Sequence, residues 1–267
     1  MRPILCFMRY SFLAVFRYRS NQLWPLTQPL LLALPALLVA LWGEKLGTLE
    51  SFAGATGTTS YAAYLLLGAL YWNFVEVVWW IPLSVWGAMR QGTLETLWAT
   101  PLSRIGVIVG WAGGRALTVL PSFIVGIVLL GIFHPFPTGL ALGQALLVLF
   151  FSLVGSYGLA FAMVGLTLRF KDAESIVSIL GNSAPLIGGV FFPVHFLPWP
   201  LRVFAFLFPF TYGADALRAL WFGSPTLFPL SLQLLLLAAV ALLFFVLGWA
   251  VFRYLERKSR EGSLGTF

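Results

Sequence analysis

Three polar side chains interrupt long apolar stretches of this sequence. Asn73 and Glu76 lie near the middle of the apolar segment 61–89, and Arg115 lies within the apolar segment 105–133. A charged group in lipid is costly, so Glu76 is expected to face protein or water, where it either lines a cavity or makes a structural hydrogen bond to another helix. Arg115 either extends toward the cytoplasmic surface or pairs with a carboxylate such as that of Glu76. These three residues are candidates for lining a cavity inside the bilayer.

The sequence offers no residue set for catalysis or metal binding. Paired carboxylates, a histidine cluster and a nucleophile–base set are all absent from the membrane faces. Cys6 is the only cysteine, and His134 and His195 are far apart, so neither a disulfide nor a Cys/His metal site is expected. The phosphate-binding pattern G-x-x-x-x-G-K-[ST] does not occur. We therefore expect no enzymatic activity and no cofactor in this chain.

A longer polar run, Arg90–Arg104, separates the two apolar segments. Gly92 and Thr93 can open a short helix with Thr93 as its N-cap, and Pro101 would end that helix. A short helix between two apolar segments is suited to contacting a partner outside the bilayer. The alternative is an interfacial loop that contains one helical turn. The candidate contact residues are Gln91, Gly92, Thr93, Leu94, Glu95, Leu97, Trp98 and Pro101.

The short helix is predicted to be amphipathic. Leu94, Leu97 and Trp98 recur at i, i+3 and i+4 and share one apolar face, whereas Glu95 lies on the polar face. Because the segment is too short to bury itself, the apolar face is predicted to be the surface that contacts the partner, with Glu95 at the rim.

The composition indicates an integral membrane protein. The chain is 60% hydrophobic and only 9% charged, whereas soluble domains carry roughly 25% charged residues. Its apolar segments run for about 20 residues without strand-like alternation, which favours helices. The net charge of +7 comes from basic residues between apolar segments and at the chain ends, where they set topology. Nucleic acid is therefore not an expected partner.

The predicted fold is an all-α polytopic membrane protein made of one domain, 1–267. Residues 1–22 interleave arginines with aromatic residues and are expected to form a basic amphipathic helix on the cytoplasmic face. A cleaved signal peptide is the alternative, but its apolar core would be too long. Six membrane spans are predicted at 23–43, 61–89, 105–133, 140–168, 176–194 and 230–252.

Local features refine three of these segments. Pro82 is expected to tilt or kink the second span. Gly106, Gly110 and Gly114 form a ridge of small residues for close helix packing in the third. The glycines and proline of the fifth span suit a helix that bends or breaks.

The segment 195–229 is too polar for a span. It is expected to form two short helices, at about 199–208 and 212–222, that dip into the outer leaflet, with Asp215 and Arg218 paired on the helix surface. With both termini inside, the predicted cytoplasmic segments hold most of the Lys and Arg, and the outer ones hold Lys45, Arg202 and Arg218. This asymmetry predicts a multi-pass protein of the cytoplasmic membrane with both termini cytoplasmic.

Several short motifs, in order and spacing over nearly the whole chain, resemble those of the membrane subunits, or permeases, of ABC type-2 transporters, most of which are exporters. The motifs are Arg90–Leu97 with Thr100-Pro101, Arg169–Asp172, Gly189–Pro193 with Leu197-Pro198, Phe208–Tyr212 and Asp215–Arg218.

The resemblance implies a specific assembly. Two permeases would form a homo- or heterodimer in membrane lipid, each docked on a cytoplasmic ABC ATPase subunit that binds ATP and Mg²⁺. Gln91–Pro101 would be the coupling helix in a groove of that ATPase, 1–22 the interfacial connecting helix, and 197–222 the re-entrant outer helices. ATP-driven closure of the ATPase pair would then open the cavity between the permeases outward.

The resemblance leaves the substrate open, and the first hypothesis is export of a hydrophobic small molecule or drug. The abundant Trp and Phe suit such a substrate and also a lipid or polysaccharide. The same machinery exporting a lipid or a lipid-linked polysaccharide is the alternative. A secondary transporter using Glu76 and Arg115 would need an internal repeat of broken helices, which is not evident. A polytopic membrane enzyme lacks the residues for catalysis.

Overall fold

The structure, a computed structural model of the 267-residue chain, describes residues 2–17, 27, 31, 34, 38, 42, 53–54, 56–58, 60–100, 103–170 and 173–261. The main helices are α1 (Arg2–Phe16), α4 (Tyr61–Glu76), α5 (Trp80–Arg90), α6 (Thr93–Ala99), α7 (Arg104–Phe133), α8 (Leu140–Arg169), α9 (Ala173–Ile187), α10 (Trp199–Ala205), α11 (Pro209–Phe222) and α12 (Leu230–Glu261). Two short 3-10 helices are η1 (Val77–Trp79) and η2 (Val194–Phe196).

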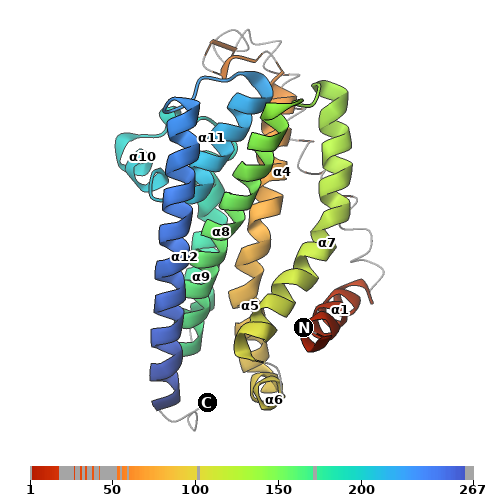
Figure 1. Ribbon diagram of the computed structural model, residues 1–267, viewed down its shortest axis with the longest axis vertical. Coiled ribbons are helices and arrows are strands. Elements are labelled where there is room, and N and C mark those ends of the chain that lie inside the picture. The colour runs from red at the N-terminus through yellow and green to blue at the C-terminus, as the bar shows by residue number, and fades with distance from the viewer. Residues whose placement is uncertain are drawn as a thin grey trace.

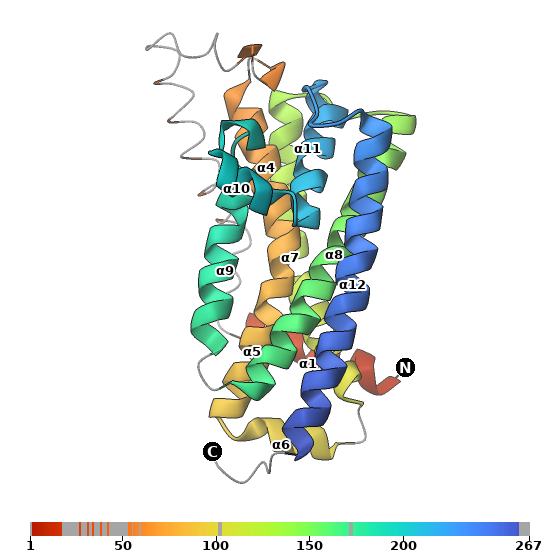
Figure 2. The ribbon, with the colours of Figure 1, turned by 90° about the vertical axis from the view of Figure 1, so that its left-hand side faces the viewer.

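The long helices run roughly side by side in an upright bundle (Figure 1). The described helices α8 and α12 lie side by side along most of their length, as Figures 1 and 2 both show. Helix α6 and the C-terminal end of α12 lie at one end of the bundle, and α10 and α11 lie toward the other (Figure 2). Helix α1 crosses the flank of α7 nearer the α6 end.

Three of the described helices are long and apolar enough to cross a membrane, and two bent helix pairs could each add one more span. The three lie at Arg104–Ile132, Leu140–Arg169 and Leu230–Lys258. The chain is therefore a multi-pass, all-helical membrane protein in its described part. The predicted first span, 23–43, falls almost entirely outside the described residues.

The second predicted span is one broken helix. Helices α4 and α5 meet at η1 with a bend of 41°. Pro82 follows this break, and its ring removes the N–H that would otherwise donate to the carbonyl of Val78 in a regular helix. The predicted kink at Pro82 is confirmed, and the break falls in the turn that precedes the proline.

The fifth predicted span is wrong in extent. Helix α9 begins at Ala173 and ends at Ile187, whereas the sequence predicted 176–194. At a rise of 1.5 Å per residue its 15 residues reach only about 22 Å, short of the roughly 30 Å of bilayer hydrocarbon. The helix ends in a turn where Gly189 has φ +66°, a conformation that favours glycine.

The two short helices predicted within 195–229 are confirmed as helices. Helices α10 and α11 meet at a bend of 92°, and α11 ends at Gly223, which has φ +66°. Helix α12 follows and continues to Glu261, beyond the predicted end of the sixth span at 252. Its basic last turns extend the helix past the apolar window.

Candidate functional site

The N-cap of helix α6 lies one residue earlier than predicted. Gly92, not Thr93, is the N-cap residue, with φ +66° in the left-handed region. Helix α5 runs up to Arg90, so the chain must reverse within two residues, and a glycine adopts that conformation without strain. The Thr93 hydroxyl instead donates to the carbonyl of Ala88 at 3.3 Å. The helix ends at Ala99, and Pro101 lies outside the described residues.

The apolar face of α6 points into the bundle of its own chain. Leu94 is only 6% exposed and packs in a cluster that includes Val85 and Ile108, against which Leu97 and Trp98 are half-buried. The expectation that the segment is too short to be buried by its own chain is therefore wrong, because neighbouring helices cover Leu94 and partly cover Leu97 and Trp98. Contact of this face with an outside partner stays a prediction. The side of α6 left exposed is polar. It consists of Gln91, Gly92, Thr93, Glu95, Thr96, Ala99 and Thr100.

Arg104 connects α6 to the rest of the bundle. Arg104 Nη1 donates to Glu256 Oε1 at 2.9 Å, and the same guanidinium lies 4.2 Å from the centre of the Trp98 ring. Glu256 is 8% exposed and Arg104 is 26% exposed, so the ion pair is partly shielded from water. Three helices, α6, α7 and α12, are thereby joined at the end of the bundle. No local pattern indicates this contact, because its two charges belong to distant segments.

Asn73 and Glu76 lie at the seam between the second and third predicted spans. Asn73 is 4% exposed, and Ser122 Oγ of α7 donates to its Oδ1 at 3.5 Å. The Glu76 carboxylate is half-buried and interacts with the Trp80 indole, and it has a Coulombic interaction with Arg115. Asn73 therefore makes a contact between helices, and Glu76 lies at the break that follows α4.

Arg115 and Glu76 are electrostatic neighbours without a direct ion pair. Each carries a Coulombic interaction with the other, but the one described salt bridge within 4.0 Å joins Arg104 to Glu256. The Arg115 guanidinium lies instead 4.4 Å from the centre of the Trp80 ring. The sequence thus predicted the proximity of the two charges, while the closest partner of Arg115 is an aromatic face.

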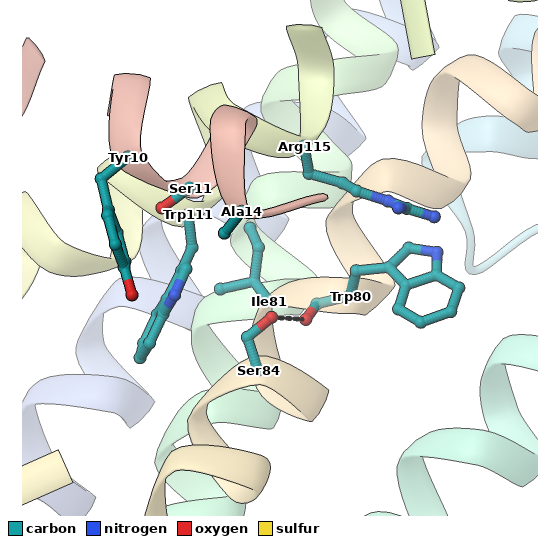
Figure 3. A pocket seen from close by; sticks show the side chains of 8 residues that line it. All are labelled: Tyr10, Ser11, Ala14, Trp80, Ile81, Ser84, Trp111 and Arg115. Carbon is teal, nitrogen blue, oxygen red and sulfur yellow. Dashed lines mark hydrogen bonds between the residues drawn. The ribbon is translucent and has the colours of Figure 1, made fainter. Parts of the chain in front are cut away.

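A cavity of about 360 Å³ lies between α1, α5 and α7. Arg115 and Trp80 lie together on one side of it, and Tyr10, Ser11 and Trp111 lie on another (Figure 3). Asn73 and Glu76 are not among its lining residues. The full lining is Tyr10, Ser11, Ala14, Trp80, Ile81, Ser84, Trp111 and Arg115.

The glycine ridge on α7 receives α1. A Cβ built at Gly110 would lie 2.4 Å from the Phe7 ring, and one at Gly114 would lie 2.6 Å from Ser11 Cβ. Helix α1 can approach so closely only because these positions lack side chains. The predicted ridge for close helix packing is confirmed at these two positions, and its partner is the N-terminal helix.

The predicted pair Asp215–Arg218 is wrong in its place on the surface, and the two charges interact without a direct ion pair. Arg218 is 3% exposed and donates to the carbonyl of Gly189 at 2.7 Å and to that of Val190. Its guanidinium also lies 4.0 Å from the centre of the Tyr64 ring. Asp215 accepts from the Leu227 N–H at 2.9 Å and from Gln233 Nε2 at 3.1 Å. The two charges therefore bind different segments inside the bundle.

Within the part of the chain that the structure describes, no group of three or more His, Cys, Asp or Glu residues could hold a metal ion. A family model described as ABC-2 type transporter matches residues 4–222. The matched segment runs from α1 to the end of α11 and includes α6, the Asn73–Glu76 seam and Arg218. A comparison with curated proteins finds no match.

Proposed function

The chain belongs to the ABC-2 type transporter family, and we propose that it exports a hydrophobic small molecule or drug across the cytoplasmic membrane with a separate ATPase subunit. Membership of this family makes the chain a permease, the membrane component of an ABC transporter, which is not itself the ATPase. In the proposed assembly two permeases, identical or different, each dock on a cytoplasmic ATPase that binds ATP and Mg²⁺. Both termini lie in the cytoplasm.

The observation that carries the proposal is the exposed polar face of α6. Glu95, Thr96 and Thr100 are exposed at one end of the bundle, while Leu94 anchors the other face. A polar face held rigidly at the end of a bundle suits a docking surface rich in hydrogen bonds and charge pairs. The coupling contact is therefore proposed to use this polar face rather than the apolar one.

The buried face of α6 is proposed to transmit movement of the ATPase to the helix bundle. Because Leu94 and Trp98 pack against the bundle, a push on α6 moves the helices beneath it. Arg104 joins Trp98 to Glu256 and so extends the connection to α12. Glu76, at the helix break, is proposed to line the pathway that this motion opens.

The experiment co-expresses the permease with the ATPase encoded by a neighbouring reading frame. Glu95→Lys and Thr96→Lys each place a cation on the polar face, and Thr138→Lys makes the same change at an exposed position after α7. We expect the α6 variants to fold but to lose at least about tenfold in ATPase affinity, since like or unpaired charges at an interface cost that much or more.

Thr138→Lys should hold the ATPase as the unaltered permease does, and substrate should still stimulate ATP hydrolysis. Normal co-elution and normal stimulated hydrolysis in both α6 variants would exclude the polar face as the docking surface. If the unaltered permease never co-elutes with such an ATPase, the proposed partner itself is wrong.

A further inference from the structure

The cavity between α1, α5 and α7 is lined by none of the residues of the exposed α6 face. Its volume, about 360 Å³, falls within the range of roughly 300–1,000 Å³ typical of ligand pockets. The walls come from three helices, one of which, α1, packs against α7 (Figures 1 and 3). A space of this size between a surface helix and two helices of the bundle can admit part of a small amphiphile.

Most of the cavity wall is apolar. Tyr10, Trp80 and Trp111 contribute aromatic rings and Ile81 an aliphatic side chain. Tyr10 is 67% exposed, so it lies at the mouth, where the cavity meets the surroundings of α1. Such walls suit the hydrocarbon part of a ligand and disfavour a fully hydrated ion.

Two hydrogen-bond donors in this wall have no partner in the described part of the chain. They are Nε of Arg115 and Oγ of Ser11, and both atoms are buried. Buried polar groups in proteins are nearly always hydrogen-bonded. A guanidinium with a free donor matches an anionic oxygen acceptor such as a phosphate or carboxylate. The Ser11 hydroxyl lies on another side of the cavity (Figure 3).

The other polar groups near Arg115 already have partners. Ser84 Oγ donates to the Trp80 carbonyl at 2.7 Å (Figure 3). The Glu76 carboxylate interacts with the Trp80 indole, and its attraction to Arg115 acts at a distance rather than through a direct ion pair. Glu76 therefore stabilises the positive charge of Arg115 without accepting a hydrogen bond from its Nε.

We propose that this cavity binds an anionic phospholipid, with the headgroup phosphate at Arg115 and the start of an acyl chain against Trp111 and Ile81. A lipid is favoured over a soluble anion because the mouth lies at α1, whose Leu5 and Leu13 are 57% and 52% exposed. Such apolar side chains on a basic surface helix place it at the boundary between headgroups and acyl chains. The lipid would fill the space beneath α1 and fix that helix against α7. This site is independent of the proposed function.

The test is native mass spectrometry of the full-length permease in detergent micelles, titrated with phosphatidylglycerol, phosphatidylcholine or inorganic phosphate. The unaltered protein should retain one phosphatidylglycerol molecule. Arg115→Gln should bind this lipid about tenfold or more weakly, as expected for the loss of one charge-assisted hydrogen bond. Arg90→Gln is the matched control, because Arg90 also lies over a tryptophan of α5, Trp86, but does not line the cavity.

A second pair of variants leaves Arg115 unchanged, so the proposal can still be tested if Arg115→Gln misfolds. Ala14→Phe should fill the cavity and expel the lipid, whereas Leu13→Phe, one position earlier on α1 and not in the cavity wall, should not. Retention of phosphatidylglycerol by Ala14→Phe at the unaltered affinity would overturn the proposal. If phosphatidylcholine binds as tightly as phosphatidylglycerol, the site does not select an anionic headgroup and the proposal is wrong. If inorganic phosphate displaces the lipid, the ligand is a soluble anion instead.

Discussion

Arg104 Nη1 donates a 2.9 Å hydrogen bond to Glu256 Oε1, and these residues lie 152 positions apart in the sequence. Arg104 is the first residue of α7, and Glu256 lies in the last turns of α12. Because the same guanidinium covers the Trp98 ring, one side chain connects the surface helix α6 to the C-terminal helix. This connection makes the end of the bundle a single mechanical unit.

Removing either charge should loosen this end of the bundle. Arg104→Gln and Glu256→Gln are each expected to lower stability by about 1–2 kcal/mol, since the pair is only partly shielded from water. The double variant should cost less than the sum of the two single variants. Thermal unfolding in detergent measures the cycle, with Arg90→Gln as a control that removes an arginine lying over Trp86. Strict additivity would mean that the ion pair contributes no coupling energy.

Several features of the fold could be predicted because they follow from local chemistry. A proline inside a helix must break a hydrogen bond, and the second span bends just before Pro82. Glycines spaced four apart leave a groove, and α1 occupies it at Gly110 and Gly114. Prolines and a polar composition marked α10 and α11 as short helices.

The errors share one cause, which is that helical periodicity defines a face but not what covers it. The spacing of Leu94, Leu97 and Trp98 identified an apolar face correctly, yet α5 and α7 of the same chain bury it. The spacing of Asp215 and Arg218 suggested a pair, yet backbone carbonyls and amides from distant turns bind them instead. Those partners depend on tertiary packing, which the spacing of residues along one helix cannot reveal.

Because α1 and α7 are in close contact, adding one methyl group to α7 at Gly114 is expected to displace α1. A Cβ at Gly114 would lie 2.6 Å from Ser11 Cβ and 3.1 Å from the Met8 carbonyl, so Gly114→Ala must push α1 away. Tryptic cleavage at Arg9 of α1 and at Arg17 just after it, both of which are exposed, should then become faster. Gly143→Ala in α8 is the control, because nothing lies within 4 Å of its Cβ position. Unchanged cleavage of Gly114→Ala would show that α1 can shift without detaching.

Glu76→Gln tests the proposed role of this carboxylate in the translocation pathway. Glutamine keeps the shape and can still accept a hydrogen bond from Trp80, but it removes the charge that faces Arg115. Transport is expected to fall about tenfold, equivalent to a loss of roughly 1.4 kcal/mol, while expression and folding remain normal. Glu174→Gln, at the start of α9, should transport normally. Equal transport rates and substrate range in Glu76→Gln and the unaltered protein would remove Glu76 from the pathway.

The proposed orientation predicts which positions reagents reach from outside the cell. In a Cys6→Ser background, Thr138→Cys, at the connection of α7 with α8, should react with a membrane-impermeant maleimide in sealed cells. Thr96→Cys on α6 should react only after the membrane is opened, although both positions are exposed in the structure. Labelling of Thr96→Cys in sealed cells would reverse the orientation and exclude a cytoplasmic docking role for α6.

Arg218 and Arg202 allow a direct comparison of a buried and a half-buried arginine with the same chemistry. Arg218 donates to the carbonyls of Gly189 and Val190 inside the bundle, and Arg202 donates through Nη2 to those of His195 and Leu197, at 2.5 and 3.1 Å, near the surface. Removing Arg218 leaves two buried carbonyls without donors, whereas water can replace Arg202 at least at the exposed carbonyl of His195.

Arg218→Gln is therefore expected to lower the free energy of unfolding by about 3 kcal/mol or more, and Arg202→Gln by about 1 kcal/mol or less. Arg218→Lys should recover only part of the loss, because an ammonium group lacks the planar fork that reaches two carbonyls at once. The Tyr64 ring, 4.0 Å from the guanidinium, also stabilises a flat cation better than a compact one. Thermal unfolding of the three variants in detergent gives the comparison. If Arg218→Gln proves no less stable than Arg202→Gln, then Arg218 does not hold the turn after α9 against α11.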